Sequence, residues 1–219
     1  MCAYSNAFSY DGTFEGFLCV AVRCINMRLI PLEIKRRTED GSIQDLQYNS
    51  IRTNKVIADK MYALIGKQGS REIQQMIYDS FLTCIPDKEI DTYIFICKIL
   101  KFGAVVAEYR EDEVVRRIHL AIQDLYREAQ AELSRLDLVS IDGHQLAVIN
   151  PRNNVLPVVK DAILHRIDGD KDVDIYDKRH RLLLQRHAGI ERIIDTYGLL
   201  NIDTDNVEDL YKQLINYVV

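Results

Sequence analysis

Residues 8–17 read Phe8-Ser9-Tyr10-Asp11-Gly12-Thr13-Phe14-Glu15-Gly16-Phe17. The pattern predicts a short strand, a tight turn at Asp11 and Gly12, and a helix whose first turn Thr13 caps. Apolar residues at helical spacing extend this helix to about Met27. We therefore expect an N-terminal part that is mainly helical but contains a first strand.

Further helices are expected downstream of this opening. Residues 29–34 indicate a strand, and Pro31 favours an edge position because proline lacks a backbone N–H. Three helices follow, over residues 55–67, after Ser70 and after Asp87. The strongest pattern covers residues 111–136, whose apolar stripe consists of Val114, Ile118, Ile122, Leu125, Ala129, Leu133 and Leu136. We interpret this long amphipathic helix as the spine of the domain, with a partner-binding surface as the alternative.

The pattern changes after the long helix. Residues 138–149 predict a β-hairpin around Asp142 and Gly143. A helix capped by Asn154 and carrying Pro157 in its first turn is expected to extend to about Ile167. Further strands are expected at 173–176 and 182–184, followed by a helix over 207–217. The predicted fold class is α+β, in which a helical N-terminal part precedes a small antiparallel sheet with flanking helices. We expect one domain over 1–219, with a subdomain seam near 139–141 between a mainly helical 1–138 and a mixed 139–219.

Composition limits the classes of function. Hydrophobic residues make up 47% of the 219 positions, enough for a packed core. A net charge of −5 argues against a chain that coats DNA by charge alone, although a local basic face is compatible with nucleic acid. The five cysteines form no Cys-x-x-Cys pair, so we expect no metal site and no cofactor. No stretch approaches the roughly 20 apolar residues of a membrane span, and we expect a cytoplasmic protein with no membrane partner.

Several stretches resemble one known family in the expected order. They are residues 10–17, Arg127-Glu128-Ala129, Asn150-Pro151-Arg152-Asn153-Asn154-Val155-Leu156-Pro157, and Ile175-Tyr176-Asp177-Lys178-Arg179. They are similar to a bacterial domain-of-unknown-function family described as a probable DNA metabolism protein. That domain is typically encoded beside a radical-SAM protein or fused to a uracil-DNA-glycosylase-like domain. The resemblance implies an accessory protein in DNA repair or modification, whose partners would be nucleic acid or a radical-SAM or glycosylase-type protein.

Two positions depart from the family pattern. Asn153 stands where the family commonly has histidine before Asn-Val-Leu-Pro, and Gln130 stands where it tends to have histidine near the end of the long helix. Imidazole is the usual general acid–base at neutral pH, and an amide cannot replace it in proton transfer. These departures favour a binding role over catalysis.

The candidate nucleic-acid-binding residues lie in two segments. Asn153 and Asn154 precede a helix whose free N–H groups would suit a phosphate, with simple capping as the alternative. The densest basic segment contains Lys178, Arg179, His180, Arg181, Arg186 and His187. Within it Lys178, Arg179 and Arg181 are expected to follow a phosphate backbone, and the neighbouring Tyr176 to stack on an unpaired base. A charged hairpin edge that resists aggregation is the alternative.

Asp11 and Glu15 are the candidate catalytic residues. They flank a helix start four positions apart, where paired carboxylates can bind a metal or act as a base. The alternative is that both carboxylates stabilise the positive end of the helix dipole. The leading functional hypothesis is thus the accessory protein. Its alternatives are a glycosylase-like or nuclease-like enzyme that uses Asp11 and Glu15, and a non-catalytic helical interaction protein.

Overall fold

The fold is of the α+β class, as the sequence predicts. A computed structural model describes residues 6–37, 48–196, 204 and 206–218. The chain forms two compact units, unit 1 over residues 1–122 and unit 2 over 123–219. The division falls inside the long helix α5 (Glu113–Arg135) rather than at the seam expected near 139–141. The part before the seam contains α-helices and a parallel sheet.

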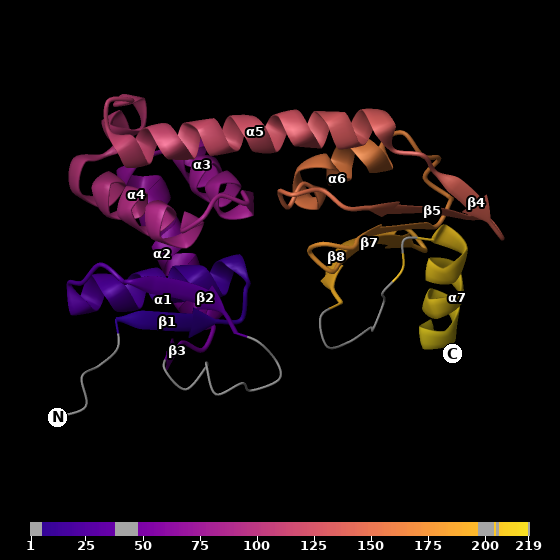
Figure 1. The fold of residues 1–219 in the computed structure, drawn as a ribbon, viewed down its shortest axis with the longest axis horizontal. Helices are drawn as coiled ribbons and strands as arrows, with labels where there is room; N and C mark the ends of the chain where they lie inside the picture. Colours follow the sequence, from indigo (N-terminus) through magenta and orange to yellow (C-terminus); the bar gives the residue numbers. More distant parts are fainter. Residues whose placement is uncertain (1–5, 38–47, 197–203, 205, 219) are drawn as a thin grey trace. The chain divides into compact units, whose positions relative to one another are not determined.

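The sheet of unit 1 has three parallel strands in the order β2-β1-β3 (Figure 1). They are β1 (Ala7–Tyr10), β2 (Glu33–Arg36) and β3 (Asn49–Ser50). In the central strand, Phe8 lies opposite Ile34 of β2 on one side and Asn49 of β3 on the other. The strand expected over residues 29–34 is present as an edge strand at 33–36, with Pro31 before it, whereas β3 was not predicted.

The first helix follows β1 directly, as expected. In α1 (Phe14–Met27) the Thr13 hydroxyl accepts a hydrogen bond from the Gly16 N–H at 3.0 Å, so the predicted N-cap is confirmed. A Cβ on Gly16 would lie 2.2 Å from Asp11 Oδ1. Position 16 therefore needs glycine, because any side chain there would displace the Asp11 carboxylate.

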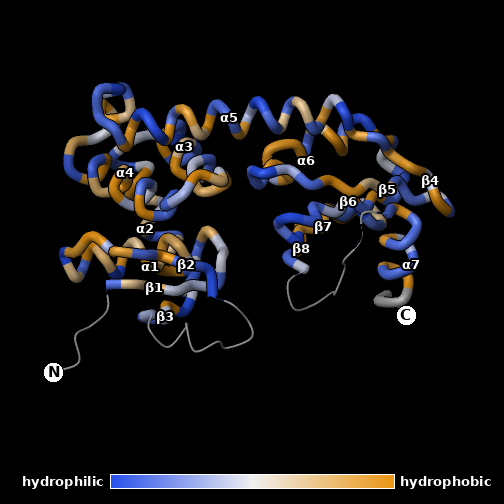
Figure 2. The backbone as a smooth tube through the Cα atoms, viewed as in Figure 1, coloured by the Kyte–Doolittle hydropathy of each residue, from blue (hydrophilic) through white to orange (hydrophobic). Residues whose placement is uncertain are grey.

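Between β3 and α5, the described residues of unit 1 form three further α-helices and a 3₁₀-helix. They are α2 (Lys55–Gln68), α3 (Arg71–Leu82), α4 (Lys88–Phe102) and the 3₁₀-helix η2 (Ala104–Glu108). The Ser70 hydroxyl caps α3 by accepting from the Ile73 N–H, and Gly103 ends α4 with a positive φ of 78°. Figure 2 shows α5 alternating between hydrophobic and hydrophilic residues, which is the stripe that predicted it. No helix in the described ranges combines the length and apolar composition that a bilayer span requires.

Unit 2 is built on a five-stranded sheet in the order β4-β5-β6-β7-β8. The strands are β4 (Val139–Ile141), β5 (His144–Ile149), β6 (Val173–Asp177), β7 (Leu182–His187) and β8 (Ile190–Asp195). The hairpin at Asp142 and Gly143 is confirmed, and three of the four strand pairs are antiparallel. The β5–β6 pair is parallel because α6 (Leu156–Leu164) lies between these strands in the chain, as a parallel connection requires. Strand β8 was not predicted.

Opposite faces of this sheet carry different contacts. Alternate side chains point to opposite faces of a strand, so Leu183 and Gln185 share one face of β7 while Leu184 and Arg186 share the other. Helix α7 (Val207–Val218) covers the first face, where its Leu210 and Leu214 pack on Leu146, Tyr176 and Leu183. The second face receives the end of α6, whose last carbonyl oxygens contact Arg186. The functional residues of unit 2 lie on the face that α7 covers.

Candidate metal centre

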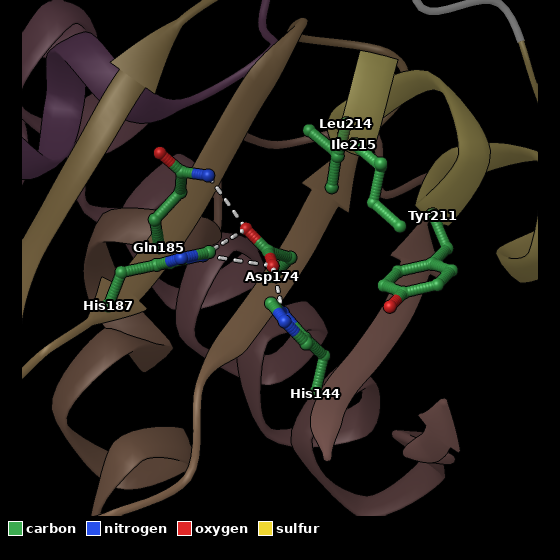
Figure 3. A pocket seen from close by; sticks show the side chains of 7 residues that line it. All are labelled: His144, Asp174, Gln185, His187, Tyr211, Leu214 and Ile215. Carbon is green, nitrogen blue, oxygen red and sulfur yellow. Dashed lines mark hydrogen bonds and ion pairs between the residues drawn. The ribbon is translucent and has the colours of Figure 1, made fainter. Parts of the chain in front are cut away.

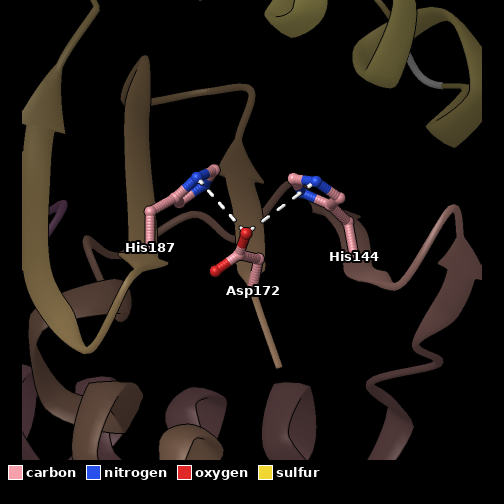
Figure 4. A group of neighbouring side chains, drawn as sticks. All are labelled: His144, Asp172 and His187. Atoms are coloured by element: carbon pink, nitrogen blue, oxygen red, sulfur yellow. Dashed lines mark ion pairs between the residues drawn. The ribbon is translucent and has the colours of Figure 1, made fainter. Parts of the chain in front are cut away.

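Two histidines and an aspartate lie in a row across three strands of unit 2. In the sheet register, Val173 of β6 pairs with Gln145 of β5 and with Arg186 of β7. The adjacent positions His144, Asp172 and His187 therefore form the next row, and their side chains project from the other face of the sheet. Figure 4 shows the three side chains converging.

The atoms of this row are close enough to share one metal ion. Asp172 Oδ2 lies 3.9 Å from Nε2 of His144 and 3.9 Å from Nδ1 of His187. The ligand atoms of the three residues all lie within 4.8 Å of one another. Bonds of about 2.0–2.2 Å from a metal to nitrogen or oxygen allow two ligands to stand up to about 4.4 Å apart. A small inward movement of the side chains would therefore complete the coordination.

A buried carboxylate holds both histidine rings in place. Asp174 is 1% exposed, and it accepts hydrogen bonds from His187 Nε2 at 2.9 Å and from His144 Nδ1 at 3.4 Å (Figure 3). Gln185 fixes this carboxylate by donating from Nε2 at 2.7 Å. An ionised carboxylate can only accept, so each ring carries its proton on the nitrogen that faces Asp174. The other nitrogen of each ring, with its lone pair, then faces Asp172.

The row opens into a pocket next to α7. The pocket has a volume of about 200 Å³, and its walls include Tyr211, Leu214 and Ile215. The Tyr211 ring lies 5.5 Å from the His144 ring, and its hydroxyl donates to Asp142 Oδ2 at 3.0 Å. Three protein ligands leave further coordination positions on a metal ion, and this pocket offers space for a water or a small ligand there. The apolar walls would also limit access of solvent to the site.

This cluster was not predicted from the sequence. His187 is expected only as part of the basic segment, and no metal site is expected from the sequence. The residues are distant in sequence and meet only because β5, β6 and β7 align in one register. The available signal was the spacing of two along each strand. It places Asp172 and Asp174 on one face of the sheet, and Gln185 and His187 on the same face of the neighbouring strand.

The basic segment divides between the turn and the core. Arg179 and Arg181 are exposed and Lys178 is half-buried, all in the turn between β6 and β7. This turn lies at the other end of the hairpin from the His–Asp row, five residues or roughly 16 Å along the strand. The Asp177 carboxylate stabilises it by accepting from the His180 backbone N–H and the His180 ring.

Tyr176 and Arg186 do not belong to an exposed basic surface. The Tyr176 side chain is 0% exposed because α7 packs on it, so we correct the expectation that it stacks on a base. Arg186 is 5% exposed, and its guanidinium bonds backbone carbonyls at the end of α6. Among the residues expected to contact nucleic acid in this segment, those of the turn alone retain a surface position.

Asn153 and Asn154 occupy a polar junction with α5. The Glu128 carboxylate accepts from the backbone N–H groups of Arg152 at 2.8 Å and Asn153 at 2.9 Å, and from the Asn153 amide at 2.6 Å. Partial burial favours the neutral acid, but the hydrogen bonds from Arg152 and Asn153, together with the charge of Arg152, outweigh it and hold the pKa of Glu128 below its usual range. The Asn153 side chain is buried and also reaches Asp124. A phosphate would have to displace these carboxylates, so the expected role of Asn153 in binding nucleic acid is not supported.

Asn154 does not cap α6 as expected. The N-cap position belongs to Val155, and no side chain caps the helix, although proline stands in the first turn as predicted. The Asn154 Oδ1 atom is buried without a hydrogen-bond partner among the described residues. An acceptor atom in this position does not attract a phosphate, so the geometry gives Asn154 no evident part in anion binding.

Asp11 and Glu15 point to different surroundings. Asp11 accepts from the Thr13 hydroxyl at 2.7 Å and the Thr53 hydroxyl at 2.5 Å, whereas Glu15 lines a cavity with Phe14. Partial burial would raise the pKa of Asp11, but the hydrogen bonds from Thr53 and Thr13 lower it overall. A carboxylate stabilised in its ionised form is a weak base, so this geometry favours a structural role at the start of α1.

Comparisons with protein-family models, with curated proteins and with solved structures found no match. The family resemblance of residues 10–17 and of the later segments therefore stays a prediction. A fold of the α+β class is compatible with many activities, so function has to be inferred from the side chains of the site.

Proposed function

We propose that unit 2 binds a divalent transition-metal ion through His144, Asp172 and His187. The observation that carries this proposal is the placement of Asp174, which accepts from one nitrogen of each ring while the other nitrogen faces Asp172. Metal-binding histidines commonly donate their second ring N–H to a carboxylate in this way. Two imidazoles with one carboxylate suit Zn²⁺ or Fe²⁺ better than Mg²⁺ or Ca²⁺, which prefer oxygen ligands.

The function would be metal-dependent binding or chemistry in the pocket beside α7. An ion with three protein ligands can take a water or a substrate oxygen in a remaining position. Such an ion lowers the pKa of bound water or polarises a carbonyl or phosphoryl oxygen. Under this proposal, any enzymatic activity belongs to the His–Asp row and not to Asp11 and Glu15.

Calorimetric titration of the metal-free protein with Zn²⁺ tests the proposal. We expect one ion per chain, and we expect His144→Ala and His187→Ala each to weaken binding about a hundredfold, because each removes a ligand from a set of three. His165→Ala is the matched control, since this histidine is exposed at the end of α6. Melting temperatures of the metal-free variants show whether each one is folded. Equal Zn²⁺ affinity in wild type and in a folded variant that lacks both His144 and His187 would contradict the proposal.

A second candidate function is nucleic-acid binding in repair or modification, alone or with a radical-SAM or glycosylase-type partner. The exposed Arg179 and Arg181 in the turn between β6 and β7 favour it, as does the family resemblance. Arginines at such a tip can contact phosphate oxygens without reading bases. The turn and the His–Asp row lie at opposite ends of the hairpin, so this function does not depend on metal binding.

Salt-dependent binding to labelled DNA and RNA tests this second function. We expect the variant with Arg179→Glu and Arg181→Glu to lose at least about tenfold in affinity at low salt, with a shallower dependence on salt concentration. Arg127→Glu serves as the control of equal chemistry, because it is exposed on α5 outside the turn. Unchanged affinity in the double variant would remove the turn from any nucleic-acid interface.

A further inference from the structure

Unit 1 contains a cavity that the metal proposal does not use. It lies among α1, α2 and α3 and has a volume of about 340 Å³, within the range of small-molecule sites. Its apolar floor includes Leu18 and Ala58, and its walls include the aromatic rings of Phe14, Tyr62 and Tyr78. The cavity is thus a concave site with aromatic sides.

The aromatic rings meet at nearly right angles. Phe14 lies 5.8 Å from Tyr62 with an interplanar angle of 88°, and 5.1 Å from Tyr78 with an angle of 80°. A planar guanidinium stacks on a single flat face, whereas rings that form a corner can surround a rounded ammonium group from several sides. The ring geometry therefore favours an alkylammonium over an arginine side chain.

Carboxylates supply a negative environment around these rings. Glu15 and Asp59 line the cavity, and both are exposed. Burial, and then the charges of Glu15 and Asp79, raise the pKa of Tyr78. Burial and the charge of Asp79 also raise the pKa of Tyr62, and the charge of Arg71 offsets part of this rise. Two carboxylates of the lining thus face a space in which none of the described lining residues is a cation.

We infer that this cavity binds an alkylammonium cation, held by the faces of Phe14, Tyr62 and Tyr78 and by the charges of Glu15 and Asp59. Aromatic faces attract a cation within about 6 Å of the ring centroid, and the attraction grows as the cation leaves water. The amide of Gln75, a lining residue, donates to the buried Asp79 carboxylate at 2.8 Å. The inference is independent of the metal site, which lies in unit 2.

NMR titration of the whole protein with choline and with its neutral isostere, 3,3-dimethylbutan-1-ol, tests the inference. The two probes share a shape and differ in charge. We expect choline to bind about fivefold tighter or more, and the variant with Glu15→Gln and Asp59→Asn to lose that preference. Equal binding of both probes, or no binding of choline at high millimolar concentration, would overturn the inference.

Two further variants separate recognition from loss of structure. Glu108→Gln with Glu111→Gln removes two exposed charges of the same unit outside the cavity, and we expect it to bind choline as wild type does. Tyr62→Leu keeps an apolar wall but removes one ring, and it should weaken choline more than the isostere. The control variant could lose choline binding as fully as the variant with Glu15→Gln and Asp59→Asn. The net charge of the protein, and not the cavity, would then explain choline binding, and the inference would fail. The affinities of N-acetyl-trimethyllysine amide and phosphocholine are then compared. The tighter ligand shows whether the cavity prefers the cation of a protein side chain or that of a lipid headgroup.

Discussion

Replacing Arg186 with methionine is expected to unfold unit 2 at a much lower urea concentration than in the wild-type protein. The Arg186 guanidinium is almost fully buried and donates to four carbonyl oxygens, those of Leu164, Ile167, Asp168 and Lys171, at 2.6–3.3 Å. These oxygens belong to the end of α6 and the turn that follows, where a helix has no intrahelical donors left. Arg186 therefore joins strand β7 to the helix on that face of the sheet.

Methionine has a similar aliphatic volume but no donors. The carbonyl oxygens of Leu164 and Asp168 also accept from the backbone N–H groups of Ile167 and Lys171, so the substitution takes the donor mainly from the carbonyls of Ile167 and Lys171. A carbonyl left without a partner costs about 1–3 kcal/mol. We expect a total loss of about 3–5 kcal/mol for unit 2, a large part of the roughly 5–15 kcal/mol that stabilises a typical domain. Urea titration followed by far-UV circular dichroism measures it.

Arg179→Met is the matched control for this loss. Arg179 is exposed in the turn between β6 and β7, so the same chemical change should alter the free energy of unfolding by less than about 0.5 kcal/mol. If Arg186→Met and Arg179→Met unfold at the same urea concentration, the carbonyl contacts do not stabilise the junction of α6 with the sheet.

Local signals in the sequence predicted the elements that local chemistry determines. Thr13 and Ser70 cap helices because their hydroxyls accept from N–H groups three positions on, and Gly103 ends a helix with a positive φ. The turn at Asp142 and Gly143 likewise forms from residues that tolerate positive φ. In each case the partner atoms lie within a few positions along the chain, so one sequence suffices to predict the contact.

Long-range contacts determine the burial and the partners of the remaining site residues, and a single sequence does not show these contacts. Tyr176 reads as an exposed tyrosine beside a basic turn, but α7, more than 30 residues later, covers its face of the sheet. Arg186 reads as one more basic residue until the end of α6 is placed against it. His144 and His187 become neighbours only through the pairing of β5 and β7 with β6.

The second large effect is expected at Asp174. Asp174→Asn preserves the volume of the side chain but replaces one acceptor oxygen with an N–H₂ donor, which cannot accept from a histidine N–H. The remaining oxygen can still accept from one ring, so one of His144 and His187 would lose its acceptor and its fixed orientation toward Asp172, although all three proposed ligands remain present. Carboxylates that orient metal-binding histidines typically contribute 10–100-fold in affinity, and we expect a loss of about that size for Zn²⁺.

The visible spectrum of bound Co²⁺ separates orientation of the ligands from coordination. Asp172→Asn changes a proposed ligand, so it should alter the Co²⁺ spectrum as well as the affinity. Asp174→Asn should lower the affinity while leaving the spectrum of the saturated protein as in wild type, because the same three side chains coordinate the ion. A merely structural role for Asp174 predicts a lower melting temperature with unchanged Zn²⁺ affinity in the folded protein. A changed Co²⁺ spectrum in Asp174→Asn would instead make Asp174 itself a ligand, with the two histidines turned to face it.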